Sequence, residues 1–365
     1  MNNKIKPLAF YLPQFHPIPE NNQWWGPGFT EWTRVANAKP LFKGHHQPII
    51  PADLGFYDLR LAKTRSDQAE LAKKYGVHGF IYYHYWFGKG KMLLEQPLEE
   101  VIELGEPDFP FCLCWANHSW YNTWEAGKKN QVFMEQTYNG MEDVKKHVAY
   151  LAPIFNDKRY IKIDGAPVFM IFAADIKEME FIIKAYKEEA KNYGIKDIYF
   201  IASNVANDSM DYKKVGFDAR ISGAYGKALG QATAQQNIIE KLKYKLNRAV
   251  NPSYPRIVDY VKVSEMMEEE KSSSIPTFPM VLPNWDNTAR KEKFGFILKG
   301  ATPQLFKQNL KKSVAYLQNA TGLPEHFLIL KSWNEWAEGN ILEPDTKYGH
   351  QYLQVLKEVI DESNK

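Results

Sequence analysis

Cysteine is scarce in this sequence. Two of the 365 residues are cysteines, Cys112 and Cys114, and a strand would point both side chains the same way because they lie two positions apart. This spacing excludes a disulfide framework, and we expect both thiols to be buried as small apolar side chains. Such cysteine usage is typical of a reducing compartment.

Long apolar segments are also missing. No apolar stretch reaches the roughly 18 residues of a membrane span. The first residues, Met1–Pro7, lack the apolar core and cleavage site of a signal peptide. We therefore expect a cytoplasmic protein without a membrane span.

An excess of charge of one sign is missing as well. Lys and Arg number 46 against 43 Asp and Glu, and no long basic run occurs. A nucleic-acid partner or a role at an anionic membrane therefore has little support. Neither G-x-G-x-x-G nor G-x-x-x-x-G-K-[ST] is present, which disfavours a nucleotide-binding Rossmann or P-loop enzyme without excluding a sugar-nucleotide donor. No H-E-x-x-H or C-x-x-C spacing occurs, and we predict neither a metal nor a cofactor.

What the chain does contain is a series of eight short runs that are apolar on both faces, a pattern typical of buried parallel strands. The runs are Pro7–Leu12, Gly79–Tyr85, Pro110–Trp115, Pro167–Ala173, Ile198–Ser203, Ala219–Ala224, Thr277–Pro283 and Phe327–Trp333. Amphipathic segments between them predict helices over Leu59–Tyr75, Met141–Phe155, Lys177–Tyr193, Pro303–Asn319 and Tyr348–Ile360. Strand and helix alternate eight times, so the sequence predicts an α/β fold, a single (β/α)8 TIM barrel over residues 1–365.

Two connections are much longer than a barrel requires. They follow the first and sixth runs, at Pro13–Asp58 and Tyr225–Pro276. Helices are expected in the second connection over Ala234–Val250 and Ile257–Lys271. The connection Val205–Gly216 is short, and its helix is doubtful. Long loops in a compact domain are usually functional or disordered, and the aromatic residues of the first favour order.

All ten tryptophans fall at the end of a predicted strand or in the loop after it, where the active site of such a barrel lies. They are Trp24, Trp25, Trp32, Trp86, Trp115, Trp120, Trp124, Trp285, Trp333 and Trp336. One Trp is most often part of the core, but a cluster suits sugar rings, whose C–H faces stack on indole while amides bind the hydroxyls. We predict substrate contacts for Tyr11, Gln14, His16, Trp25, Tyr83, His84, Tyr85, Trp115, Asn117, Trp120, Asn284, Trp285, Asp286, Trp333, Asn334 and Trp336.

Two glutamates, Glu335 and Glu338, lie three apart at the tip of the last predicted strand. Such a pair is common on solvated helix faces, and its place among tryptophans is what favours catalysis. If the chain turns helically after Glu335, both side chains share one face. If it stays extended, they point apart. Cleavage of a glycosidic bond needs one protonated and one ionised carboxyl group, so we predict these two as the catalytic residues.

Several motifs resemble the WbsX-like glycosyltransferase family, also described as glycoside hydrolase family 99-like, from residue 8 to about residue 353. They are YLPQFHPIPEN from Tyr11, WWG from Trp24, GFTEWT from Gly28, YYHYWF from Tyr82, CLCWAN from Cys112, WDNTAR from Trp285 and WNEWAEG from Trp333. The resemblance implies a (β/α)8 barrel whose nearest characterised relatives are retaining endo-α-mannosidases. One departure comes directly after Asn117. Family members often have Glu-Asn-Trp after the Trp-Ala-Asn motif that ends in this residue. Here His118-Ser119-Trp120 follows and is expected to shape a subsite.

The resemblance also implies roles for the glutamates. The equivalent of Glu335 deprotonates the sugar 2-hydroxyl, which attacks the anomeric carbon to form a 1,2-anhydro sugar. The equivalent of Glu338 protonates the leaving oxygen and then activates water. A retaining hydrolase of α-linked, mannose-like glycans is the first hypothesis. A glycosyltransferase of surface polysaccharide biosynthesis and a non-catalytic glycan-binding barrel are the alternatives. Each takes an oligosaccharide or polysaccharide as its partner, and the oligomeric state stays open.

Overall fold

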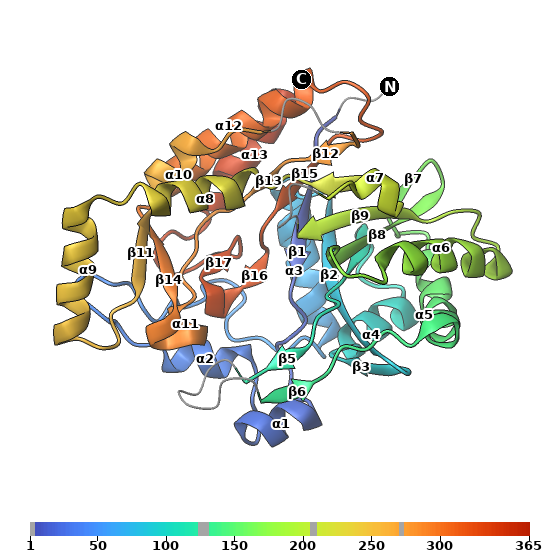
Figure 1. The fold of residues 1–365 in the computed structure, drawn as a ribbon, viewed down its shortest axis with the longest axis horizontal. Helices are drawn as coiled ribbons and strands as arrows, with labels where there is room; N and C mark the ends of the chain where they lie inside the picture. Colours follow the sequence, from blue (N-terminus) through green and yellow to red (C-terminus); the bar gives the residue numbers. More distant parts are fainter. Residues whose placement is uncertain (1–3, 123–130, 205–209, 270–273) are drawn as a thin grey trace.

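A ring of parallel strands forms the centre of the molecule in the computed structural model, which describes residues 4–122, 131–204, 210–269 and 274–365 (Figure 1). The ring strands in these ranges are β1 (Lys6–Tyr11), β2 (Gly79–Gly88), β4 (Phe111–Trp115), β8 (Ala166–Ala173), β9 (Tyr199–Asn204), β10 (Ala219–Ile221), β12 (Thr277–Phe278) with β13 (Met280–Val281), and β15 (Phe327–Leu330). They coincide with the eight predicted runs. The (β/α)8 barrel is thus confirmed.

The ring closes at a strand that Pro279 interrupts. On one side β12 pairs with β10, and on the other β13 pairs with β15. Proline has no N–H to donate to a ladder, but the carbonyl of Pro279 accepts a hydrogen bond of 2.9 Å from the Ile329 N–H. Thus β12 and β13 are two halves of the seventh barrel strand.

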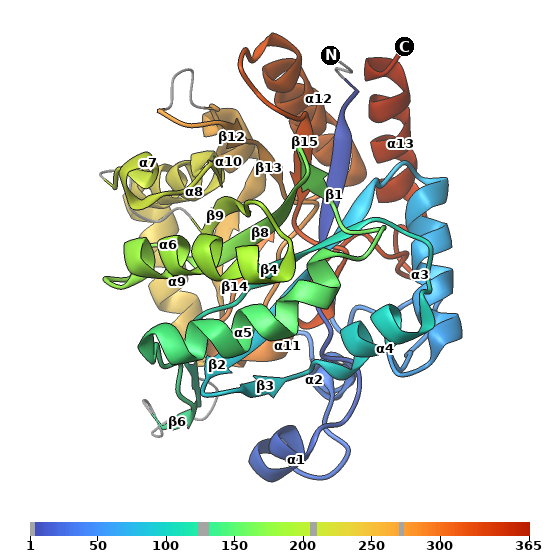
Figure 2. The ribbon, with the colours of Figure 1, turned by 90° about the vertical axis from the view of Figure 1, so that its right-hand side faces the viewer.

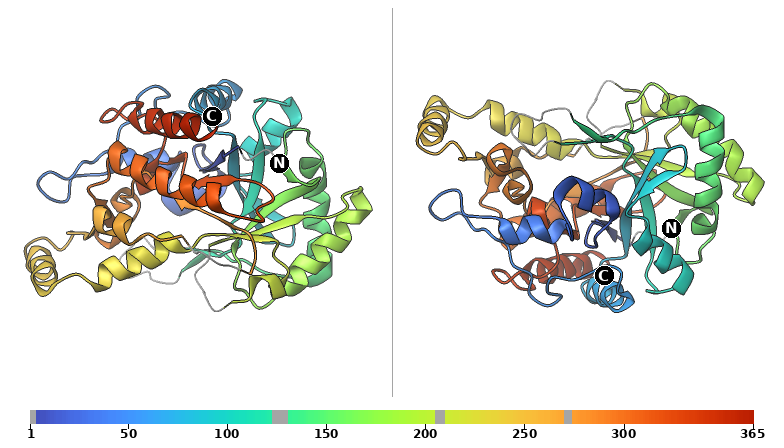
Figure 3. Two further views of the ribbon diagram at one scale, coloured as in Figure 1. Left: turned by 90° about the horizontal axis from the view of Figure 1, so that it is seen from above. Right: turned by 90° about the horizontal axis from the view of Figure 1, so that it is seen from below.

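Helices cover the outside of the ring, as Figures 2 and 3 show. In chain order they are α3 (Ala62–Lys74), α4 (Gln96–Leu104), α5 (Gly140–Phe155), α6 (Met179–Ala190), α7 (Tyr212–Val215), α8 (Ala224–Ala234), α12 (Pro303–Asn319) and α13 (Gln351–Ser363). The five helices expected after runs one, three, four, seven and eight are present with small shifts at their ends. None of the helices in the described ranges is long and apolar enough to cross a membrane.

Additional short elements follow the carboxyl ends of the strands. They are α1 (Pro19–Trp25), α2 (Glu31–Asn37), β3 (Lys91–Leu93), β5 (Trp120–Tyr121), β6 (Val132–Met134), α11 (Thr288–Lys291), β14 (Phe296–Lys299), β16 (Asn334–Glu335) and β17 (Asn340–Ile341). Figure 1 places α1, α2, β5 and β6 at the end of the molecule opposite both termini. The first long connection is therefore ordered in its described residues, as its aromatic content suggested.

The second long connection differs from the prediction in two places. The sixth strand ends at Ile221, because helix α8 already begins at Ala224. The expected helix Ile257–Lys271 starts instead as strand β11 (Arg256–Asp259), which pairs in parallel with β14. Among its described residues, 257–269, only α10 (Tyr260–Met266) is helical. The partner strand comes some forty residues later, so local sequence did not reveal it. Helix α9 (Ile238–Val250) lies within the other predicted helix.

Candidate active site

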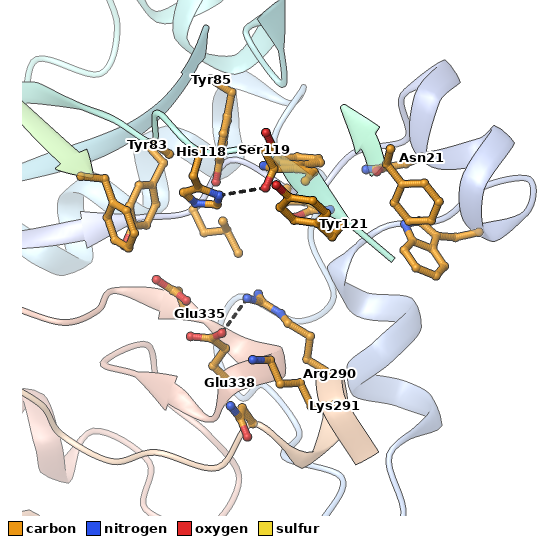
Figure 4. A pocket seen from close by; sticks show the side chains of 18 of the residues that line it. Asn21, Tyr83, Tyr85, His118, Ser119, Tyr121, Arg290, Lys291, Glu335 and Glu338 are labelled. Atoms are coloured by element: carbon orange, nitrogen blue, oxygen red, sulfur yellow. Dashed lines mark hydrogen bonds and ion pairs between the residues drawn. The ribbon is translucent and has the colours of Figure 1, made fainter. Parts of the chain in front are cut away.

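Glu335 and Glu338 lie on a short hairpin beyond the last barrel strand. Strand β16 pairs with β17, and the 3-10 turn Trp336–Glu338 joins the two. The chain therefore turns helically after Glu335, which is the condition under which both carboxylates share a face. Both line the same cavity, and Figure 4 shows them side by side.

Gly339 makes this tight turn possible. Its φ of 53° lies in the left-handed region that glycine adopts without strain. A Cβ at this position would lie 3.0 Å from both the Cβ and the carbonyl oxygen of Asp286. The Asp286 N–H in turn donates a 2.7 Å hydrogen bond to the carbonyl of Glu338. The hairpin is thus pressed against the loop after the seventh strand, and this contact fixes the position of Glu338.

Two cations contact the carboxylates. The Lys331 ammonium donates to Glu335 Oε1 at 3.0 Å and to the hydroxyl of Tyr83 at 2.6 Å. The Arg290 guanidinium donates to Glu338 Oε1 at 2.7 Å and also to Glu31, whose side chain is fully buried. Each glutamate therefore has its own bonded cation, and Arg290 is shared with a third carboxylate.

These charges move the two carboxyl pKa values in opposite directions. Burial alone would raise the pKa of Glu335, but Lys331, a hydrogen bond with Glu338 and the charge of Arg290 together hold it well below its usual range. Burial raises the pKa of Glu338. The charge of Arg290 lowers it and the charge of Glu335 raises it again, so the pKa of Glu338 stays above its usual range. When the pair holds a single proton, these opposite shifts favour Glu338 as its site and leave the negative charge on Glu335.

The cavity has a volume of about 620 Å³, within the range of small-molecule sites. It is lined mainly by aromatic rings and by a smaller set of polar groups. The aromatic residues are Trp24, Trp25, Tyr83, Tyr85, Trp120, Tyr121, Phe133, Phe172, Trp285, Phe294 and Phe296. The polar ones are Gln14, Asn21, His118, Ser119, Asn287, Arg290, Lys291, Lys331 and the two glutamates.

The aromatic wall joins segments that are distant in the chain. Trp24 of α1 stacks on Phe133 of β6 with ring centroids 5.0 Å apart, and Trp25 meets the edge of the same ring. Trp120 of β5 packs edge-on against Tyr85 of β2 at 5.1 Å. Indole and phenyl faces that line one cavity with two carboxyl groups suit the C–H faces and hydroxyls of a sugar.

The structure brings eight of the eighteen predicted site residues to this cavity. Those that line it are Gln14, Trp25, Tyr83, Tyr85, Trp120, Trp285, Glu335 and Glu338. Of the ten tryptophans, Trp24 also lines it, and Trp124 lies outside the described residues. The remaining ten predicted residues lie away from the cavity lining.

Three of those ten are strand residues that face outward. Tyr11 donates to Gln68 of α3 at 2.6 Å, and Trp115 donates through its indole N–H to the carbonyl of Trp86. The ring of His84 is hydrogen-bonded to His147 of α5 at 2.7 Å, and burial lowers its pKa to about 3. These side chains pack the barrel against its helices. Their neighbours Tyr83 and Tyr85 lie on the opposite face of β2 and reach the cavity.

Three predicted amides bind backbone. Asn117 joins the ends of β4 and β8, accepting from the Ala173 N–H at 2.7 Å and donating to its carbonyl at 2.9 Å. Asn334 forms the same paired contact with Leu12, and Asn284 accepts from the N–H of Ile341. These side chains hold the strand ends and the glutamate hairpin in place.

The remaining four support the site from behind. Asp286 accepts hydrogen bonds from His45, from Gln47 and from Thr288, at the start of the helix that carries Arg290. Trp336 donates to the buried carboxylate of Glu343 at 2.6 Å. The other two, His16 and Trp333, are buried, and Trp333 packs against Phe80.

The cations of the site were missed by sequence reasoning. Arg290 lies in one of the family-like motifs, and Glu31 lies in another, but neither carried a predicted role. Lys331 had a usable signal, because it is a charged residue directly after an apolar strand and four positions before Glu335. The described residues contain no group of three or more His, Cys, Asp or Glu placed to hold a metal ion.

Comparison with known protein families gives a match over most of the chain. A model of the family described as Glycosyltransferase WbsX matches residues 7–356. The uncharacterized protein WxcX of two Xanthomonas campestris pv. campestris strains is 34% identical over 357 residues. That match covers 97% of this chain and 49% of the relative, so the chain spans about half the length of the curated relatives it matches.

Solved structures share the fold at low identity. A GH99 endo-alpha-mannosidase from Bacteroides thetaiotaomicron, in complex with BIS-TRIS-Propane, has a TM-score of 0.58 and 13% identity, covering 98% of this chain and 97% of that one. A second structure of a GH99 endo-alpha-mannosidase from the same organism has a TM-score of 0.54 and 14% identity, covering 98% and 97% of the two chains. A glycoside hydrolase-like protein has a TM-score of 0.58 at 15% identity, covering 97% and 93%. These likenesses show a common barrel.

Proposed function

The chain belongs to the family described as Glycosyltransferase WbsX and is a carbohydrate-active enzyme, and we propose that it cleaves an α-linked, mannose-like glycan with retention of configuration. The observation that carries this proposal is the pair of carboxyl groups that line one cavity, each bonded to its own cation and with pKa values shifted in opposite directions. Opposed protonation states are what general acid and base catalysis at one glycosidic bond requires.

Glu335 is the base in this proposal, and Glu338 is the acid. The ionised Glu335 removes the proton of the sugar 2-hydroxyl, and that oxygen bonds to the anomeric carbon. The bond from the anomeric carbon to the leaving oxygen breaks, and this oxygen takes the proton of Glu338. A 1,2-anhydro sugar, a protonated Glu335 and an ionised Glu338 result.

The second step restores both side chains. Glu338 removes a proton from water, whose oxygen attacks the anomeric carbon from the face that the leaving group vacated. The bond between the anomeric carbon and the epoxide oxygen on C2 breaks, and this oxygen takes the proton held on Glu335 to become the 2-hydroxyl again. Two inversions give net retention.

The spacing of the carboxyl groups supports retention. In inverting glycosidases they lie roughly 6.5–9.5 Å apart, which leaves room for a water molecule between sugar and base. Here each carboxyl group acts directly on the pKa of the other, as two groups do that lie close together. Lys331 is bonded to Glu335 and Arg290 to Glu338, so the negative charge of the pair is balanced without a bound ligand.

The test of this function uses α-mannan oligosaccharides, with the anomeric configuration of the first product read by proton NMR. We expect reducing ends of retained configuration. E335Q and E338Q should each lower turnover by about 10²–10⁴-fold, the usual contribution of a general acid or base. E180Q is the matched control, because Glu180 is exposed on α6. Wild-type turnover in either catalytic variant would contradict the assignment.

Glycosyl transfer is the second candidate, and the family description favours it. The same two carboxylates can deliver the glycosyl group to a sugar hydroxyl in place of water. Incubation with sugar nucleotides and an oligosaccharide acceptor distinguishes the two reactions. Nucleotide release with a lengthened glycan identifies a transferase, whereas glycan binding without turnover in either assay would leave only a binding protein.

A further inference from the structure

Helix α9 presents an apolar face that none of the described residues covers. No residue of this helix is buried. Five large apolar side chains on it are exposed: Ile238 (84%), Ile239 (63%), Leu242 (54%), Leu246 (59%) and Val250 (88%). Figures 1 and 3 show the helix at the outer edge of the molecule, beyond β11 and β14. Such a contiguous apolar surface marks an interaction site.

The five side chains form one stripe along the helix. At about 100° per residue they cover a sector of about 120°. Lys243 borders the stripe on one side, and Lys245 and Lys241 border it on the other. Lysines at the edges of an apolar stripe can lay their methylene stems along it and keep their ammonium groups in a polar phase. This arrangement is typical of helices that lie in the plane of a membrane interface.

The charge of the helix is concentrated far beyond that of the chain. Four basic residues, the three lysines and Arg248, face a single acidic one, Glu240, within thirteen positions. The helix thus carries a net +3, the same value as the whole 365-residue chain. Glu240 is engaged by Lys262 of α10 at 3.1 Å, so it does not neutralise this surface. The near-neutral total therefore concealed a local basic surface.

The body of the protein contacts the chain at both ends of the helix. At its start, Asn237 and Glu240 form a capping box, and the preceding Gln236 side chain donates to the carbonyl of Ile257 at 3.0 Å. At its end, the Asn251 side chain donates to the carbonyl of Leu41 at 2.6 Å. The stripe is thus already formed in the free protein, and binding a surface would not require the helix to fold first.

We propose that α9 docks the protein peripherally on an anionic lipid surface, with the apolar stripe in the interface and the lysines at the headgroups. A second copy of this chain fits less well. Two such helices packed face to face would bring their lysines together, and each helix has one glutamate to offset the repulsion. An anionic surface complements both the stripe and its basic borders.

The experiment is sedimentation of the protein with vesicles of phosphatidylserine and phosphatidylcholine, and with vesicles of phosphatidylcholine alone. We expect binding to the first and little to the second, weakened by salt because the attraction between charges is screened. L242Q/L246Q should lower the partition coefficient at least about tenfold, since two apolar side chains lose their insertion. K243Q/K245Q should lower it about 25-fold, at about fivefold for each lysine near an anionic surface.

The matched control is L61Q/L104Q. Leu61 and Leu104 are exposed by 60% and 54%, nearly the same as the pair on α9, but they lie on other elements. This variant should bind like the wild type, and equal thermal midpoints will show that all variants fold. Glutamine has a high helix propensity, so the substitutions preserve α9.

Two results would overturn the proposal. One is equal binding, or none, to the anionic and neutral vesicles. The other is a wild-type dimer in sedimentation equilibrium that L242Q/L246Q converts to a monomer while vesicle binding is unchanged, which would assign the stripe to a second copy of the chain.

Discussion

Replacing Lys331 with methionine removes the cation bonded to Glu335 and keeps a side chain of similar length. The ammonium lies 3.0 Å from Glu335 Oε1, and both side chains are largely buried. An opposite charge at such a distance lowers a carboxyl pKa by about 1–3 units. Without it the pKa of Glu335 should rise by the same amount, because burial then acts with less opposition.

The expected result is a displaced acid limb in the profile of kcat/KM against pH. The ionised Glu335 is the active form, and it is lost as the pH falls through its pKa. A higher pKa brings this loss to a higher pH, so in K331M the acid limb should move up by about 1–3 pH units. The alkaline limb, which reflects Glu338, should move less, because Arg290 remains bonded to that group.

Stability should change in the same variant. Removing one partner of a buried ion pair costs about 3–5 kcal/mol, measurable by urea denaturation at pH 7. The lowered pKa of Glu335 adds stability above its unfolded value, which is lost as the pH falls through the folded pKa. In K331M this pH-dependent contribution should shrink, since the folded and unfolded pKa values come closer together.

K291M is the matched control for the pH profile, because Lys291 lines the same cavity but is not among the main charges acting on either glutamate. Its acid limb should coincide with that of the wild type, whatever happens to KM. A carbon-13 NMR titration of labelled glutamate gives the same comparison without substrate. If the K331M acid limb and the Glu335 titration both coincide with the wild type, the electrostatic reasoning is wrong.

Two further predictions concern the neighbours of the pair. E31Q should release Arg290 from its second carboxylate, so that its charge acts more strongly on Glu338. The pKa of Glu338 should then fall, and the alkaline limb of kcat/KM should move to lower pH. An alkaline limb that moves to higher pH would show that the shared guanidinium does not govern Glu338. G339A should lower kcat at least about tenfold and destabilise the protein by about 1–2 kcal/mol, because the left-handed turn then carries a Cβ. G226A, in α8 with open space around it, serves as its control in both measurements, and equal losses in the two variants would refute the role of the turn.

Much of the fold followed from local pattern, because buried parallel strands are apolar on both faces. The same property hid which face points inward. Tyr83 and His84 are adjacent and both buried, yet Tyr83 reaches the cavity and His84 packs against α5. The strand pattern predicts that neighbouring side chains point to opposite faces of the sheet. Which of the two faces points into the barrel depends on how the barrel closes. The predicted contacts on outward-facing residues failed to reach the cavity for this reason.

The cations of the site lie beyond the reach of local pattern for another reason. Glu31 and Arg290 are 259 positions apart, and only the closed ring brings them together behind Glu338. Asn117 was predicted to bind substrate but binds backbone instead. An amide at a strand end suits a sugar hydroxyl and a backbone peptide equally well, so local sequence does not distinguish the two. Here its hydrogen bonds go to Ala173.

The two ends of the chain meet on the far side of the barrel from the glutamates. Asn364 exchanges hydrogen bonds with the backbone of Ile5, at 2.8 Å to the N–H and 3.2 Å to the carbonyl, where the first strand is about to begin. Anything fused to either terminus, such as an affinity tag, a fluorophore or a solid support, therefore starts from the base of the barrel. An immobilised enzyme tethered in this way would keep the mouth of its cavity turned toward a long polymer in solution.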